Sequence, residues 1–208
     1  MPRRTSLVTT TALLAGSLLL AACGNGDSST GAGGHDMSSM SGSSTSSGSA
    51  PGSGSAPADA GRQGDVMFAQ MMIPHHRQAI EMADIALQKP SSSAPVKKLA
   101  TDIRKAQGPE ITTMTGWLRS WGAPTSMPSG HDMSGMMSSA EMDGLKKAEG
   151  PAFDRQWLTL MIKHHRGAVQ MAQGVNKTTN NPDVRTMANG IITSQNPEIR
   201  TMEGLLKK

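Results

Sequence analysis

The stretch QMMIPHHRQAIEMA, residues 70–83, decides how the chain folds. It places His75 and His76 side by side in an apolar segment, with Met72 before them and Met82 after them. Apolar residues on both sides of His75 recur at alternating steps of four and three residues, as on the buried face of a bundle helix. The stretch therefore predicts an amphipathic helix that carries a histidine on its buried face.

The chain repeats this pattern. Residues 72–83 return as residues 161–172, at an offset of 89, and residues 107–114 return as residues 195–202, at an offset of 88. Each copy thus holds two apolar helical blocks in the same order. Two copies of a helical hairpin predict an all-α fold, a four-helix bundle of the ferritin-like kind.

Local signals place several helix ends. Residues 138–141, Ser-Ser-Ala-Glu, can form a capping box, and Asn181 followed by proline is a good helix start. A Gly-Pro dipeptide ending at Pro151 should break the third segment, so the second histidine helix is expected to begin there. Pro109 and Pro197 are expected to kink their helices at matching places.

Residues 1–22 have the pattern of a bacterial lipoprotein signal. A charged start is followed by an apolar run too short to span a bilayer comfortably, and small residues precede Cys23, the one cysteine. We expect cleavage before Cys23 and acylation, for example by palmitate, which would anchor the exported protein on the extracytoplasmic face of the cell membrane. The alternative is a plain secretory signal with an incidental cysteine.

The rest of the chain divides into a tether and one domain. Residues 23–58 are dominated by Ser, Gly and Ala and should form a flexible tether. The bundle should occupy residues 59–208, with copies at about 59–122 and 138–208. The net charge of +4 includes two arginines of the signal, and aromatic residues make up 2% of the chain. Without a dense basic run or aromatic residues for base stacking, nucleic-acid binding is a poor interpretation.

Helical spacing brings sulfur next to imidazole. Met72 lies three or four residues before His75 and His76 and can share an ion with either, because such positions lie about 5–6 Å apart at Cβ. Met82 lies about 10 Å from His75 along the axis and is expected to serve a neighbouring position. A thioether is a soft, uncharged ligand that suits Cu(I), and imidazole suits both copper states. The second copy offers the same set in Met161, His164 and His165.

Packing is the alternative for each of these residues. Methionine is an adaptable core filler, and a histidine on a buried helix face is most often hydrogen-bonded to a neighbour. The chain, however, has 17 methionines against two phenylalanines and no tyrosine. Each of its six histidines also has a methionine within four residues. These observations favour metal binding over packing.

A short island, Gly-His-Asp-Met-Ser, occurs twice, at residues 34–38 and 130–134. Both islands lie in segments expected to be disordered, so core packing should not explain their methionines. The alternative is low-complexity drift. The candidate metal ligands of these flexible segments are His35, Met37, Met40, His131, Met133, Met136 and Met137.

The doubled His-His motif and the Glu-Ile-x-x-Met block resemble the domain of unknown function 305 family over residues 65–206. The resemblance implies exported or lipid-anchored bacterial proteins with a ferritin-like bundle, some of them linked to copper binding and copper tolerance. One departure is Leu205, where the first copy has Trp117. The metal-binding residues implied are Met72, His75, His76, Met82, Met161, His164, His165 and Met171. The additional or supporting residues are Glu110, Met114, Glu198 and Met202.

We therefore expect a non-enzymatic, lipid-anchored protein that sequesters or delivers Cu(I), with Ag(I) as a surrogate ion and copper-handling proteins as candidate partners. One alternative is a di-iron-like oxidase, although Met72 and Met161 stand where such a site has its glutamates, which removes the negative charge that holds iron. Another is a structural or partner-binding lipoprotein without metal. No nucleophile motif supports hydrolysis.

Overall fold

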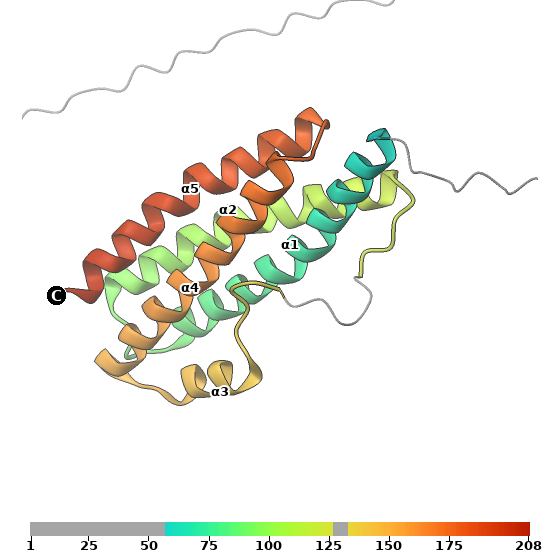
Figure 1. Cartoon of the computed structure of the whole chain (residues 1–208). Helices are drawn as coiled ribbons and strands as arrows, with labels where there is room; N and C mark the ends of the chain where they lie inside the picture. The colour runs from blue at the N-terminus through green and yellow to red at the C-terminus, as the bar shows by residue number, and fades with distance from the viewer. Residues whose placement is uncertain (1–56, 127–132) are drawn as a thin grey trace, which may run out of the picture. The chain divides into compact units, whose positions relative to one another are not determined.

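The computed structural model describes residues 57–126 and 133–208 (Figure 1). None of the described helices is long and apolar enough to cross a membrane. The expected signal and all of the expected tether except its last two residues lie outside the described residues, which begin at Pro57. The candidate residues that also lie outside them are Cys23, His35, Met37, Met40 and His131.

Four long helices form two hairpins. Helix α1 (Pro57–Gln88) packs on α2 (Ala94–Ser120), and α4 (Gly150–Asn176) packs on α5 (Pro182–Leu206). The hairpins meet through α1 and α4, and a short helix, α3 (Ser139–Lys147), contacts α4 (Figure 1). The described residues contain no strand. The predicted all-α fold of two helical hairpins is confirmed.

The helix ends follow the local signals. The Ser138 side chain accepts from Glu141 N while the Glu141 carboxylate accepts from Ser138 N, which is the predicted capping box. Helix α4 begins at Gly150, with Pro151 in its first turn, and the Asn181 side chain caps α5. Three helices continue past an internal proline, at Pro74, Pro109 and Pro197.

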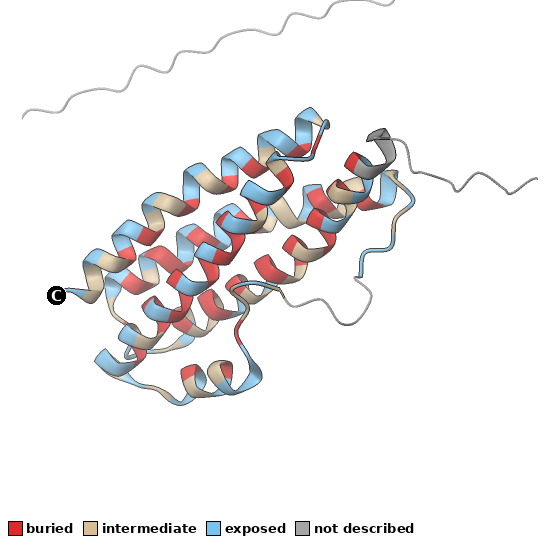
Figure 2. Cartoon of the chain, viewed as in Figure 1, coloured by how far each residue is buried: buried red, intermediate tan, exposed pale blue. Residues whose placement is uncertain are grey.

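Buried side chains line the inner faces of the four long helices (Figure 2). They form two apolar clusters, one toward each end of the bundle. One contains Trp157 and Met161, and the other contains Phe68 and Met72. Trp157 Nε1 donates to Met82 O over 2.9 Å, so the large indole is buried with its polar atom paired.

The linker before α3 corrects one expectation. Residues 133–137, the linker segment, pack on the bundle instead of lying free of it. Met137 is buried in the core at 5% exposure, and Met133 and Met136 are half-buried. The Gln78 amide donates to Met137 O over 2.9 Å and accepts from Met137 N over 2.7 Å. The prediction that packing could not explain the methionines of this island is therefore wrong for Met137, because Gln78 supplies the backbone partners that docking requires.

Candidate metal centre

Two histidines face each other in the middle of the bundle. The ring centroids of His75 on α1 and His164 on α4 lie 3.7 Å apart, with the ring planes inclined by 38°. Both side chains are fully buried. They occupy equivalent positions in the two copies, so the pair lies where the copies meet. The predicted burial of one histidine from each copy is confirmed.

The adjacent histidines, His76 and His165, are held from the partner helices. His76 Nε2 donates to Glu110 Oε2 over 2.7 Å, and His165 Nε2 donates to Glu198 Oε2 over the same distance. The histidines are buried, while about a fifth of each glutamate side chain is exposed. A carboxylate in this position fixes the orientation and tautomer of a metal-binding histidine.

These hydrogen bonds decide which ring nitrogen carries the proton. A neutral imidazole has one N–H and one lone pair, so a proton on Nε2 of His76 or His165 leaves a lone pair on Nδ1. His75 also carries its proton on Nε2, because this atom donates to Ser134 O over 3.1 Å. Five buried ring nitrogens have no hydrogen-bond partner among the described residues. They are Nδ1 of His75, His76, His164 and His165, and Nε2 of His164.

The environment keeps the facing pair uncharged. Burial, followed by the proximity of His76, lowers the pKa of His75 from 6.5 to about 3. Burial, followed by the proximity of His75, lowers the pKa of His164 well below its ordinary value. Both rings are therefore neutral at pH 7, which leaves their lone pairs available to a cation.

Methionines flank the facing pair on both sides. His75 of α1 faces His164 of α4. Met82, seven residues after His75, accepts a hydrogen bond from Trp157, seven residues before His164, so the two helices run antiparallel. Met72 precedes His75 by one turn and Met161 precedes His164 by one turn, and both are fully buried. Because the helices are antiparallel, the two methionines lie on opposite sides of the histidine pair, each in a different apolar cluster.

The remaining methionines of the motif divide between the core and the surface. Met82 is buried in the cluster of Met161, and Met171 is half-buried. Met171 lines a surface pocket with two other methionines instead of being enclosed like Met82. The structure places the supporting methionines in opposite clusters, with Met114 beside Met72 and Met202 beside Met161.

The residues present suit a soft ion better than a carboxylate-bridged metal pair. Across residues 57–126 and 133–208, no group of three or more His, Cys, Asp or Glu side chains is arranged to hold a metal ion. Glu110 and Glu198 contact the outer nitrogens of their histidines and are engaged there. Neutral nitrogen lone pairs with thioethers nearby are ligands that Cu(I) and Ag(I) prefer, and these ions accept few ligands.

The linker segment covers His75 through a contact that needs two glycines. A Cβ on Gly167 would lie 2.1 Å from Ser134 O, and a Cβ on Gly135 would lie 2.9 Å from the Cα of Gly167. Gly135 also has a φ of +84°, which side chains rarely adopt. This close approach lets Ser134 O reach His75.

Sequence reasoning missed Gln78 and Gly167 as functional positions. They are the same position in the two copies, directly after His-His-Arg, and are one of the few places where the motifs differ. Both contact the linker segment: Gln78 binds the backbone of Met137, and Gly167 admits Ser134. A mismatch inside an otherwise matching motif is the signal that could have indicated them.

Comparisons with known proteins identify relatives of this bundle. The model of the family described as Domain of unknown function (DUF305) matches residues 65–206. A DUF305 protein from Streptomyces coelicolor, whose secretion is presumed in its description, is 35% identical with a TM-score of 0.66, over 69% of this chain and 91% of that chain. A DUF305 fragment from Deinococcus radiodurans is 38% identical with a TM-score of 0.64, over 69% and 95% of the two chains.

A third relative has been crystallised with metal. CopM, in its Cu(I)-bound form, is 36% identical with a TM-score of 0.59, over 69% of this chain and 95% of that chain. CopM is also known in Cu(II)-bound and Ag-bound forms. A search of the curated proteins finds no match. Nearly the whole of each of these solved chains corresponds to the bundle of this chain.

Proposed function

The chain belongs to the DUF305 family, and on that premise we propose that it is an exported protein that binds copper as Cu(I) and holds it for storage or transfer without catalysis. The likeness to CopM in its copper-bound and silver-bound forms supports copper as the cargo. The likeness to the Streptomyces coelicolor protein supports export.

The observation that carries the proposal is the set of five buried ring nitrogens without partners around His75 and His164. Leaving a buried polar atom unpaired costs about 1–3 kcal/mol. Native proteins contain few such atoms, and each one needs an explanation. Because a neutral His164 carries one N–H, the five nitrogens offer four lone pairs, and a bound cation would account for the lone pairs that it accepts.

Each residue has a distinct role in this proposal. The Nδ1 atoms of the histidines are the proposed nitrogen ligands, with no more than two of them on one ion in the arrangement described, and the thioethers of Met72 and Met161 are the proposed sulfur ligands on either side. Glu110 and Glu198 keep the Nε2 proton on His76 and His165, so that the lone pair of each ring stays on the buried Nδ1. Neutral ligands favour a monovalent soft ion over Fe(II), which prefers carboxylates and imidazole.

The membrane anchor is part of the proposal. The sequence before Cys23 supports acylation of that residue, which would hold the bundle at the outer face of the membrane on its tether. Mass spectrometry of the membrane fraction should find an acylated Cys23 at the N-terminus of the mature chain. Unmodified Cys23, or a Cys23→Ser variant that stays in the membrane fraction, would contradict the anchor without affecting the copper proposal.

A titration of residues 57–208 with Cu(I) against a competing chelator tests the copper site. The decisive variant is His164→Phe, because His164 has no hydrogen bond to lose among the described residues. Replacing an unpaired buried polar ring by an apolar ring should leave the apo fold as stable as before, or more stable. Cu(I) affinity should fall by a factor of about 100 or more.

The control is Met187→Leu, a half-buried position on α5 outside the histidine layer. It should leave Cu(I) affinity unchanged. Parent-like Cu(I) affinity in a folded His164→Phe variant would overturn the proposed site. Tighter binding of Fe(II) than of Cu(I) by the parent would instead favour the di-iron alternative.

A further inference from the structure

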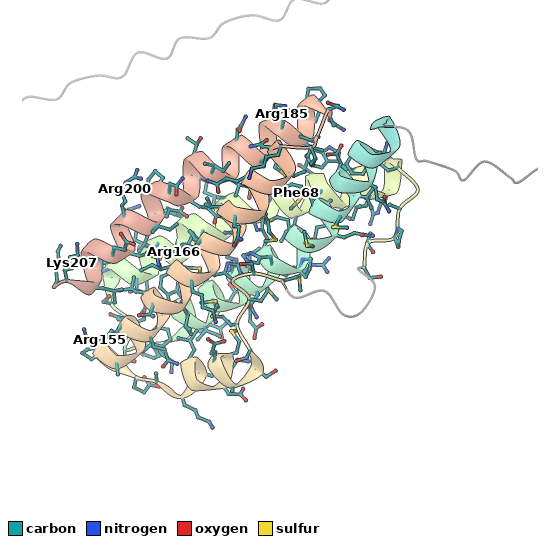
Figure 3. The ribbon with its side chains drawn as sticks, in the orientation of Figure 1. Phe68, Arg155, Arg166, Arg185, Arg200 and Lys207 are labelled. Atoms are coloured by element: carbon teal, nitrogen blue, oxygen red, sulfur yellow. The ribbon has the colours of Figure 1, made fainter. Side chains whose placement is uncertain are left out.

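A second group of methionines lies at the surface, away from the histidine layer. Met67 and Met71 of α1 and Met171 of α4 line one pocket of about 230 Å³, opened by Gly64 and Gly174. Figure 3 labels Phe68 in this part of α1. None of the residues that line the pocket is charged.

The register of the helices brings the three side chains together. Phe68 lies seven residues before His75 on α1, and Met171 lies seven residues after His164 on α4. Because His75 faces His164 and the helices are antiparallel, Phe68 and Met171 lie at the same level. Met67 is the chain neighbour of Phe68, and Met71 follows Met67 by four residues, on the same face of α1. The three methionines thus border one pocket from two helices.

The equivalent surface of the second copy has different residues and is covered by a helix. Gln156 and Leu160 stand there in place of Met67 and Met71. Helix α3 packs at this place, where a Cβ on Gly144 would lie 3.0 Å from Gln156 Nε2. The first copy has no such covering helix among the described residues.

Core packing does not account for the exposed member of the group. Met67 is 41% exposed, and it is the one exposed large hydrophobic side chain among the residues that the structure describes. An exposed helix position gains less from apolar burial than an enclosed position does. A thioether at such a position retains one property that a polar residue lacks, its affinity for soft metal ions.

We propose that Met67, Met71 and Met171 form a surface site for one Cu(I) or Ag(I) ion, separate from the histidine layer. Three neutral thioethers in an uncharged pocket match a soft monovalent ion and have little affinity for Mg²⁺, Ca²⁺ or Fe(III). Because the pocket opens to solvent, the ion can be captured there without opening the bundle. The site does not depend on the histidine centre.

The test uses methionine methyl signals in residues 57–208 labelled with ¹³C at the methyl group, in a chloride-free buffer. His164→Phe is the background, so that binding at the histidine layer is weakened. With added Ag(I), the signals of Met67, Met71 and Met171 should shift together, with one shared dependence on Ag(I) concentration. Unshifted signals at excess Ag(I), or three unrelated dependences, would overturn the site.

A stoichiometry measurement complements the spectra. Met67→Leu, Met71→Leu and Met171→Leu together keep most of the side-chain volume and remove the sulfur. Equilibrium dialysis should show one Ag(I) ion fewer per chain than in the same background without these changes, whereas Met187→Leu should show no loss. An undiminished count in the triple variant would also overturn the site. Binding at the histidine layer is read separately, from the imidazole signals of the parent.

Discussion

The two copies of the repeat build the same histidine–glutamate pair and then use the adjacent histidine differently. His76–Glu110 and His165–Glu198 have the same 2.7 Å hydrogen bond between the same atoms. His75, however, donates to the linker segment at Ser134 O, whereas His164 has no hydrogen-bond partner among the described residues. Two nearly identical motifs therefore produce an asymmetric centre.

The asymmetry originates outside the motifs. One linker joins the two hairpins, and it can dock on one side of the facing pair. Gln78 in the first copy binds the linker backbone, and Gly167 at the same position of the second copy leaves room for it. The comparison teaches that the repeat supplies the ligands in duplicate, while a single unrepeated segment decides which histidine is fixed and which is unpaired.

The largest expected effect is the loss of apo stability in acid. His75 and His164 have lowered pKa values in the folded state, so the unfolded chain binds more protons below pH 6.5. The contribution of the two histidines to the free energy of unfolding is present above pH 6.5. It is lost as the pH falls toward the pKa of His75 in the folded state, about 3. Lowering the pH from 6.5 to 5 should reduce the free energy of unfolding by about 2 kcal/mol for each histidine.

Urea unfolding at a series of pH values measures the slope of the free energy of unfolding against pH. The His164→Phe variant should lose about half of it, because one titrating ring remains. An unchanged slope in that variant would show that other groups cause the acid sensitivity and that the two rings are not equivalent contributors.

The second prediction breaks the linker contact. Gly167→Ala places a methyl group where Ser134 O now lies, so the linker segment must lift away. We expect a loss of about 1–3 kcal/mol and faster amide exchange at Met137. Gly190→Ala on α5 is the matched control, because a Cβ there meets nothing within 4 Å. It should gain about 0.5–1 kcal/mol from helix propensity. Equal effects of the two changes would mean that the linker does not dock as described.

The third prediction tests how alike the two histidine–glutamate pairs are. Glu110→Gln and Glu198→Gln should each weaken Cu(I) binding by about 10–100-fold, because the ring orientation and tautomer lose their carboxylate partner. The two losses should agree within a factor of a few, given the matching geometry. Chelator competition measures both. A loss confined to one variant would show that only one copy contributes its second histidine.

The smallest expected effect separates sulfur from packing. Met72→Leu and Met161→Leu should each change the unfolding free energy by less than about 1.5 kcal/mol, since volume and apolarity are kept. Cu(I) affinity should fall by about tenfold for each, or 1.4 kcal/mol. Because the two methionines lie on opposite sides of the facing pair, a loss from one variant alone would assign the ion to that side. Parent-like affinity in the double variant would leave both methionines as core residues.

The sequence by itself determined the helical elements and the burial of the histidines. The three-and-four spacing around His75 and His164, the offset between the copies, and the caps at Ser138 and Asn181 depend on residues within a few turns of one another. Local steric and hydrogen-bonding rules govern such features, so helix positions and the buried histidine faces were predictable. The glutamates on the partner helices were found because they repeat with the histidines.

Only the tertiary structure decided what meets across the hairpins. The antiparallel contact of α1 and α4 sets His75 against His164 and places Met72 and Met161 on opposite sides of the pair. The same packing leaves Met171 at the surface and seats residues 133–137 on Gly167. Periodicity states which face of a helix is buried but not its axial register against a distant helix, which depends on side-chain packing over the whole interface. A linker without periodicity carries no local signal that it will dock, because its partners are supplied by another part of the chain.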